Sequence, residues 1–241
     1  EKYGSTRVFG TPLSEDAMTG TAIGLALSGV RPIHVHIRMD FMMLAMNQIV
    51  NMAAKMKYMY GGQVEVPIVI RGMIGRSWGQ GAQHSQSLYS LFAHIPGFSV
   101  VAPAFPYDAK GCLIAAVRDS SPVIYIDHRM LHFQVGPVPE EVYEVERKAR
   151  ITHEGNDVTL VGVSHTQLEC LRAAYYLEKL GISVEVIDPV WLSPLDIDTI
   201  IHSCRRTRHL CVVDNDWIPY GVGAEILAGV SENIQVKKSK R

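Results

Sequence analysis

The chain has 241 residues, which is enough for one large domain or two modest ones. Hydrophobic residues make up 47% and charged residues 20%, which is typical of a globular protein and argues against a disordered chain. Lysine and arginine (23) nearly balance aspartate and glutamate (24), and the one dense basic run is residues 237–241. This pattern argues against a nucleic-acid-binding protein that relies on a basic face. No apolar run approaches about 18 residues, so no membrane span is predicted.

The four cysteines are spaced without any Cys-x-x-Cys pair, and each has apolar neighbours: Cys112, Cys170, Cys204 and Cys211. This spacing predicts buried, reduced thiols rather than a zinc site or a disulfide framework. The first residues do not show the basic-then-apolar pattern of a secretory signal. We therefore expect a cytoplasmic protein.

Short apolar runs alternate with longer helical segments in the first half of the chain, as in an α/β protein with a mostly parallel sheet. Predicted helices and strands, in chain order, are helix 15–28, strand 33–37, helix 41–59, strand 66–70, helix 85–93, strand 98–102, helix 107–120 and strand 122–126. We expect Ser14 to cap the first helix, with Glu15 favoured in its first turn by the helix dipole and Gly29 at its end.

A proline-rich stretch interrupts this alternation, and we interpret residues 136–156 as a linker. Beyond it the predicted elements are strand 158–163, helix 166–180, strand 184–187, helix 194–203, strand 210–213, helix 223–231 and a last strand at 234–236. The prediction is two α/β domains with mainly parallel sheets, residues 1–135 and 157–241, the second of them short.

Several residues allow both an ordinary and a chemical interpretation. Glu15 is either an ordinary carboxylate in the first turn of a helix or a carboxylate enclosed beside a face of small residues. In the second case burial would raise its pKa. His84 follows a glycine-containing loop at the carboxyl end of a predicted strand, where open α/β sheets bind ligands, and is an acid–base candidate. His34 and His36 share one strand face, and hydrogen-bonded packing is favoured over metal binding because no third ligand is spaced nearby. Methionines are frequent in residues 39–59, which indicates that this segment lies in the core or in a subunit interface.

A set of motifs in fixed order carries a family resemblance: Thr11-Pro12-Leu13-Ser14-Glu15, Ala82-Gln83-His84-Ser85-Gln86, His94-Ile95-Pro96-Gly97, Asp108-Ala109-Lys110-Gly111, Asp119-Ser120-Ser121-Pro122, Ile187-Asp188-Pro189, Leu192-Ser193-Pro194-Leu195-Asp196 and Gly221-Val222-Gly223-Ala224-Glu225. Together they closely resemble the beta subunit of thiamine-diphosphate-dependent 2-oxo-acid dehydrogenases, in the transketolase superfamily. The resemblance covers nearly the whole chain.

The resemblance implies roles for individual residues. Glu15 matches the glutamate that hydrogen-bonds N1′ of the cofactor's aminopyrimidine, and Phe41 matches the aromatic residue packed on that ring. Leu13 matches the apolar residue beside the pyrimidine, and His84 the active-site histidine that faces substrate or acceptor. A structural potassium ion is implied at a further set of residues: Ile68, Ala116, Val117, Asp119 and Ser121.

The family's diphosphate and magnesium motif is missing from this sequence, and in the family the alpha subunit carries it. The resemblance therefore implies half an active site, completed by an alpha subunit in an assembly with a second beta subunit, and docking to a lipoyl acyltransferase. Arg38, Met39 and the loop 76–79 differ from pyruvate-type relatives and are expected to line the mouth of the site. Two alternatives stay open: a split transketolase that transfers a two-carbon unit to a sugar, and a non-catalytic partner that keeps the fold.

Overall fold

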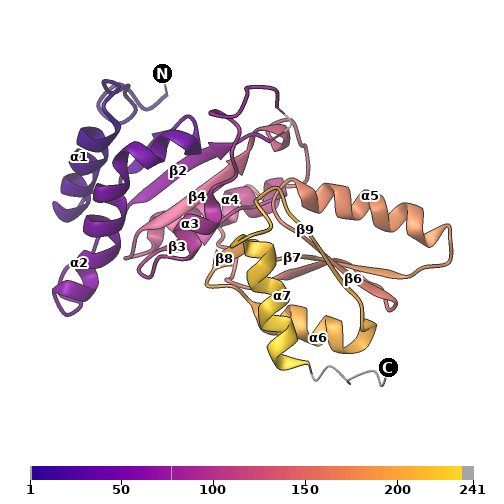
Figure 1. Ribbon diagram of the computed structural model, residues 1–241. Helices are drawn as coiled ribbons and strands as arrows, with labels where there is room; N and C mark the ends of the chain where they lie inside the picture. Colours follow the sequence, from indigo (N-terminus) through magenta and orange to yellow (C-terminus); the bar gives the residue numbers. More distant parts are fainter. Residues whose placement is uncertain (1, 77, 235–241) are drawn as a thin grey trace.

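The computed structural model describes residues 2–76 and 78–234, and the strand predicted at 234–236 lies almost wholly outside them. Two sheets organise the chain (Figure 1). Elements of the first half are α1 (Glu15–Leu27), β1 (Ile33–His36), η1 (Met39–Ala45), η2 (Asn47–Ala53), α2 (Ala54–Met59), β2 (Val69–Ile74), α3 (Tyr89–Ala93), β3 (Ser99–Val101), α4 (Pro106–Arg118), β4 (Val123–His128) and η3 (Arg129–Leu131). Elements of the second half are β5 (Arg150–His153), β6 (Val158–Gly162), α5 (Thr166–Glu178), β7 (Val184–Asp188), β8 (Trp191–Ser193), α6 (Ile197–Thr207), β9 (Leu210–Val213) and α7 (Val222–Asn233).

Both sheets are mainly parallel, which confirms the predicted α/β class. The first has the order β1-β2-β4-β3-β8, parallel except where β8 joins β3. The second has the order β5-β7-β6-β9, antiparallel only between β5 and β7. Residues 150–153, inside the predicted linker, form β5, whose Thr152 hydroxyl donates to the Val186 carbonyl at 3.1 Å.

Helices cover both faces of the central strands, so alternate side chains of one strand enter different apolar clusters. Val69 of β2 packs with Cys112 and Ala116 of α4, whereas Ile70 faces the side covered by α1, η1 and η2. The Ile70 cluster continues into the second half through Ile200 and Ile226. One apolar core therefore joins the two sheets.

The predicted helix 41–59 is helical but changes pitch twice. Residues 39–45 form a 3-10 helix, 47–53 a π-helix and 54–59 an α-helix. Met42 lies against β2, where a Cβ on Gly72 would come within 2.7 Å of its sulfur. This close contact brings the segment down onto the sheet, and it explains why Met39 and Met42 are fully buried.

Two predictions about single residues are wrong. Ser14 precedes α1, but in the described structure its side chain makes no capping hydrogen bond. Cys112, Cys170 and Cys204 are buried free thiols as predicted, whereas Cys211 is exposed. The reason is that β9 is an edge strand and leaves one of its faces partly open. No helix among residues 2–76 and 78–234 is long and apolar enough to cross a membrane.

Candidate active site

The N-terminus of α1 lies at the carboxyl edge of the first sheet. Thr19 of α1 shares its hydroxyl with the Nε2 atoms of His34, at 3.0 Å, and His36, at 3.4 Å. Gln48 of η2 donates to the Asp16 carboxylate at 3.5 Å. These contacts place the first turn of α1 above the end of β1, and Glu15 occupies that turn, half-buried. The preceding Leu13 is 96% exposed.

His34 and His36 are packed histidines, as predicted. Their rings meet edge to face with centroids 4.6 Å apart, and both contact Thr19. Burial lowers the pKa of His36 to about 4, and the neighbouring His34 adds to this shift. Both rings therefore favour the neutral form at pH 7 and hold α1 against β1.

Phe41 and His84 come together although 43 positions separate them in the sequence. Phe41 lies in η1, the segment that follows β1, and His84 lies in the loop that follows β2. Because β1 and β2 are parallel, the segments that follow them leave the same edge of the sheet. Their rings meet edge to face, with centroids 5.2 Å apart. Glu15, Phe41 and His84 thus lie along one edge, whereas the side chain of Leu13 points into solvent.

The loop 75–88 carries a bulky aromatic group. Trp78 stacks on Phe133 with ring centroids 6.4 Å apart, and the Arg129 guanidinium lies 5.3 Å from the Trp78 ring. Arg38 donates to Gln80 of the same loop at 2.7 Å. Arg38 and Trp78 therefore lie at the loop that carries His84. Met39, also predicted to line the mouth of the site, is fully buried against Gly72. Ser77, also in the predicted rim, lies outside the described residues.

The predicted potassium residues lie at the opposite edge of the sheet, where β2 and β4 begin. The carbonyl oxygens of Val117 and Asp119 both accept from one nitrogen of Arg31, each at 2.7 Å. Arg147 pairs with the Asp119 carboxylate. Two of the predicted carbonyl ligands therefore already face a cation, the guanidinium of Arg31.

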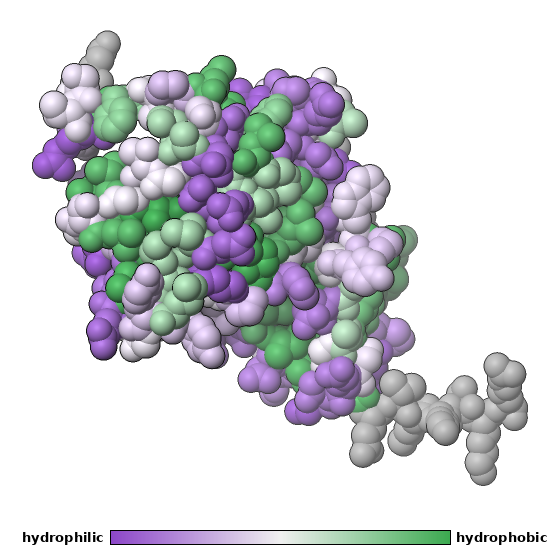
Figure 2. Space-filling view, turned by 60° about the vertical axis from the view of Figure 1, so that its left-hand side comes forward, coloured by the Kyte–Doolittle hydropathy of each residue, from purple (hydrophilic) through white to green (hydrophobic). Residues whose placement is uncertain are grey.

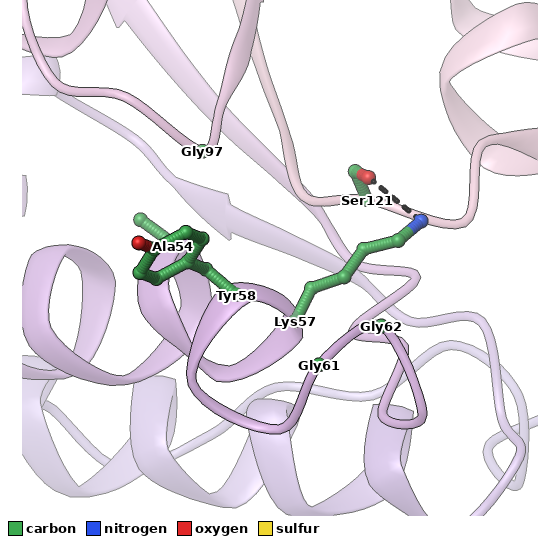
Figure 3. A pocket seen from close by; sticks show the side chains of 7 residues that line it. All are labelled: Ala54, Lys57, Tyr58, Gly61, Gly62, Gly97 and Ser121. Atoms are coloured by element: carbon green, nitrogen blue, oxygen red, sulfur yellow. Dashed lines mark hydrogen bonds between the residues drawn. The ribbon is translucent and has the colours of Figure 1, made fainter.

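A lysine reaches the same loop from α2. Lys57 donates to the hydroxyls of Ser120, at 2.8 Å, and Ser121, at 3.4 Å, beside an open hollow of about 470 Å³ at the end of α2 (Figure 3). Gly97 borders this hollow with φ +111°, and a Cβ there would lie 2.0 Å from the Ala54 carbonyl. The loop is thus surrounded by positive side chains.

Comparison with known proteins identifies the family of the chain. The family profile "Transketolase, pyrimidine binding domain" matches residues 1–133, and "Transketolase, C-terminal domain" matches residues 147–241. The acetoin:2,6-dichlorophenolindophenol oxidoreductase subunit beta of Cupriavidus necator is 45% identical over 96% of this chain and 68% of its own length. The mitochondrial pyruvate dehydrogenase E1 component subunit beta of Bos taurus is 41% identical over 96% of this chain and 66% of its own length.

The chain belongs to the beta subunits of the thiamine-diphosphate-dependent 2-oxo-acid dehydrogenases. A solved split-gene transketolase, described as an inactive beta4 tetramer, has the same fold at a TM-score of 0.82, with 23% identity over 98% of this chain and 74% of that one. The beta-subunit relatives at 41–45% identity favour the dehydrogenase over the predicted transketolase alternative.

A planar ring with hydrogen-bonding nitrogens, such as the aminopyrimidine of the cofactor, could pack and bond at this edge. The edge offers an aromatic ring, a histidine and a carboxylate, and Leu13 beside them is 96% exposed. One contact that ties this site together could not be seen in the sequence. The buried Asp40 side chain joins its segment to Gln86, 46 positions away, and no local motif signals such a pair.

Proposed function

We propose that this beta chain supplies the pyrimidine-activating half of a thiamine-diphosphate-dependent dehydrogenase, and that an alpha subunit supplies the other half. The supporting observation is the convergence of Phe41 and His84, with ring centroids 5.2 Å apart, beside the first turn of α1 that carries Glu15. Thiamine diphosphate, when bound, stabilises the negative charge that develops on a carbonyl carbon when its bond to a neighbouring carbon is broken.

Each residue has a distinct task in this proposal. Glu15 holds a proton at N1′ of the aminopyrimidine, Phe41 packs on the ring, and Leu13 covers it once the alpha subunit encloses the edge. His84 orients the substrate or the acceptor and moves a proton at that group. Magnesium and the diphosphate need oxygen ligands, which we assign to the alpha subunit.

Exposed apolar side chains support an extensive partner surface. Figure 2 brings the side of α1 forward and shows apolar patches on it. Leu13, Ile37 and Leu44, and Tyr58 and Met59 at the far end of α2, are between 61% and 96% exposed. Exposed apolar area of this kind marks protein interfaces. We propose an assembly of two alpha and two beta subunits that buries it, with a lipoyl acyltransferase as a further partner.

Two classes of small substrate fit the relatives, namely a 2-oxo acid such as pyruvate and an α-hydroxyketone such as acetoin. Trp78 stacks on Phe133 beside the loop that carries His84, and we propose that this bulky pair limits the site to a short substrate. The chain, purified with an alpha chain from the same organism, should reduce 2,6-dichlorophenolindophenol with one of the two. Transfer of two-carbon units between sugars, with no dye reduction, would instead establish the transketolase alternative.

Potassium remains a proposal, and it competes with Arg31 for the carbonyls of Val117 and Asp119. Removing the guanidinium in Arg31→Met frees both oxygens. We expect potassium, compared with tetramethylammonium, to raise the melting temperature of Arg31→Met by more than that of the unchanged chain. Equal melting temperatures in both salts for both proteins would contradict a potassium site here.

The buried thiols of Cys112, Cys170 and Cys204 support our proposal of a reducing compartment, the cytoplasm.

A further inference from the structure

The loop 75–88 is tied to the segment between β1 and η1 by two polar contacts. Arg38 donates through two guanidinium nitrogens to the side-chain oxygen of Gln80, and its Nε lies 2.7 Å from that oxygen. Gln86 donates its backbone N–H, at 3.3 Å, and its side-chain amide, at 2.8 Å, to one carboxylate oxygen of Asp40. The two ties bracket His84, one on each side of it in the sequence.

Asp40 is an unusual residue for such a tie. Its side chain is 9% exposed, and among residues 2–76 and 78–234 it forms no ion pair. Its second oxygen, Oδ2, is buried and has no hydrogen-bond partner among these residues. Burying a carboxylate without a cation costs free energy, so overall stability does not account for it. The residue has to be explained by what its hydrogen bonds hold in place.

The hydrogen bonds between Asp40 and Gln86 join the two segments that carry Phe41 and His84. Asp40 directly precedes Phe41, and Gln86 follows His84 by two positions. Residues 78–88 of the loop form neither helix nor strand and include Gly79 and Gly81, both at positive φ, which are conformationally permissive residues. Gln86 precedes α3, which starts at Tyr89, by three positions.

We propose that Asp40 is a positioning residue that sets the place of His84 against Phe41 in the active site. It acts through Gln86 and does not touch the substrate. The inference rests on the proposed function, because only there does the Phe41–His84 contact have a catalytic purpose.

The test compares Asp40→Ala with Asp40→Asn in the complete alpha–beta enzyme. Alanine removes the acceptor, so His84 is displaced, and we expect kcat to fall by about 100-fold while KM changes little, since displacements of about 1 Å can cost that much. Asparagine keeps an acceptor oxygen for Gln86 and should restore most of the turnover. A kcat of Asp40→Asn as low as that of Asp40→Ala would overturn the proposal. An unchanged kcat of Asp40→Ala would overturn it too.

A second measurement does not depend on activity. Amide hydrogen exchange of the beta chain in the complex should be faster across residues 79–88 in Asp40→Ala and unchanged in Asp40→Asn. Asp196→Ala is the matched control, because Asp196 also accepts from a backbone N–H, of Ala149 at 3.1 Å, and from a side chain, of Thr199 at 2.8 Å. It should leave exchange at 79–88 unchanged.

The two measurements separate the inference from the proposed function. If the unchanged complex turns over neither pyruvate nor acetoin, the proposed function fails, and the exchange data still decide whether Asp40 holds the loop. Unchanged exchange at 79–88 in Asp40→Ala overturns the inference in either case.

Discussion

Glu15 is half-buried in this chain, and the residue before it, Leu13, is almost fully in solvent. A carboxyl that has to hold a proton near neutral pH needs a low-dielectric surrounding, because burial disfavours its charged form. Within this chain Glu15 is only partly enclosed. In the proposed function, the alpha subunit completes the enclosure.

Glu15→Gln should abolish most of the turnover while leaving the fold intact. The amide can form a hydrogen bond but cannot exchange the proton, and losing one acid–base group costs about 10²–10⁴-fold in rate. Steady-state kinetics of the alpha–beta enzyme measure this. Asp16→Asn, in the same helical turn, is the control and should keep its turnover. Near-normal turnover of Glu15→Gln would remove Glu15 from the mechanism.

His84→Ala should impair kcat more than cofactor affinity. His84 contacts Phe41 through its ring edge, but it belongs to the loop that faces substrate. Calorimetric titration with thiamine diphosphate, together with kinetics, separates the two effects, and His94→Ala, an exposed histidine after α3, serves as the control. A collapse of cofactor binding with normal turnover at saturation would place His84 in the pyrimidine pocket instead.

At the scale of elements, β4 meets α5 through a pair of histidines. His128, at the end of β4, is fully buried and stacks on His165, just before α5, with centroids 4.6 Å apart. Burial, and next the proximity of His165 and His132, lower the pKa of His128 to about 4. This contact links an element of the first sheet to a helix that covers the second.

The contact predicts a pH dependence of stability. Because the folded-state pKa of His128 lies below its ordinary value of 6.5, the unfolded chain takes up the proton first. The contribution to stability, roughly 3 kcal/mol, is complete above pH 6.5 and is lost as pH falls toward 4. The free energy of unfolding, measured with urea between pH 7.5 and 4.5, should depend less steeply on pH in His128→Asn than in the unchanged chain. His202→Asn, at an exposed histidine, should keep the pH dependence of the unchanged chain. The same pH dependence in His128→Asn as in the unchanged chain would contradict this account.

Most strands could be predicted from sequence because each is a buried apolar run between turn residues. β9 (Leu210–Val213) matches its prediction fully. β8 could not be predicted, because its three residues are a strand only by pairing with β3, a long-range contact. Helix 85–93 was predicted four residues too early, since α3 begins at Tyr89. Gln86, inside the predicted helix, instead bonds to the distant Asp40. The site residues were predicted from motifs, whereas the tie that holds them was not.

At the scale of the molecule, one apolar core joins two sheets, and the edge of the first sheet that carries Glu15, Phe41 and His84 is left open. The exposed apolar residues beside that edge, Leu13 and Leu44 among them, are consistent with a permanent interface. Interfaces of that class bury about 2,000–5,000 Å². We therefore expect the isolated beta chain to self-associate or to be poorly soluble.

The central claim is that this chain holds half of a cofactor site. Calorimetric titration with thiamine diphosphate and magnesium, carried out on the beta chain alone and on the complex with its alpha chain, tests it most directly. We predict no tight binding to the beta chain alone and stoichiometric binding to the complex. Tight, stoichiometric binding by the beta chain alone would contradict the half-site and indicate a self-sufficient assembly of beta chains.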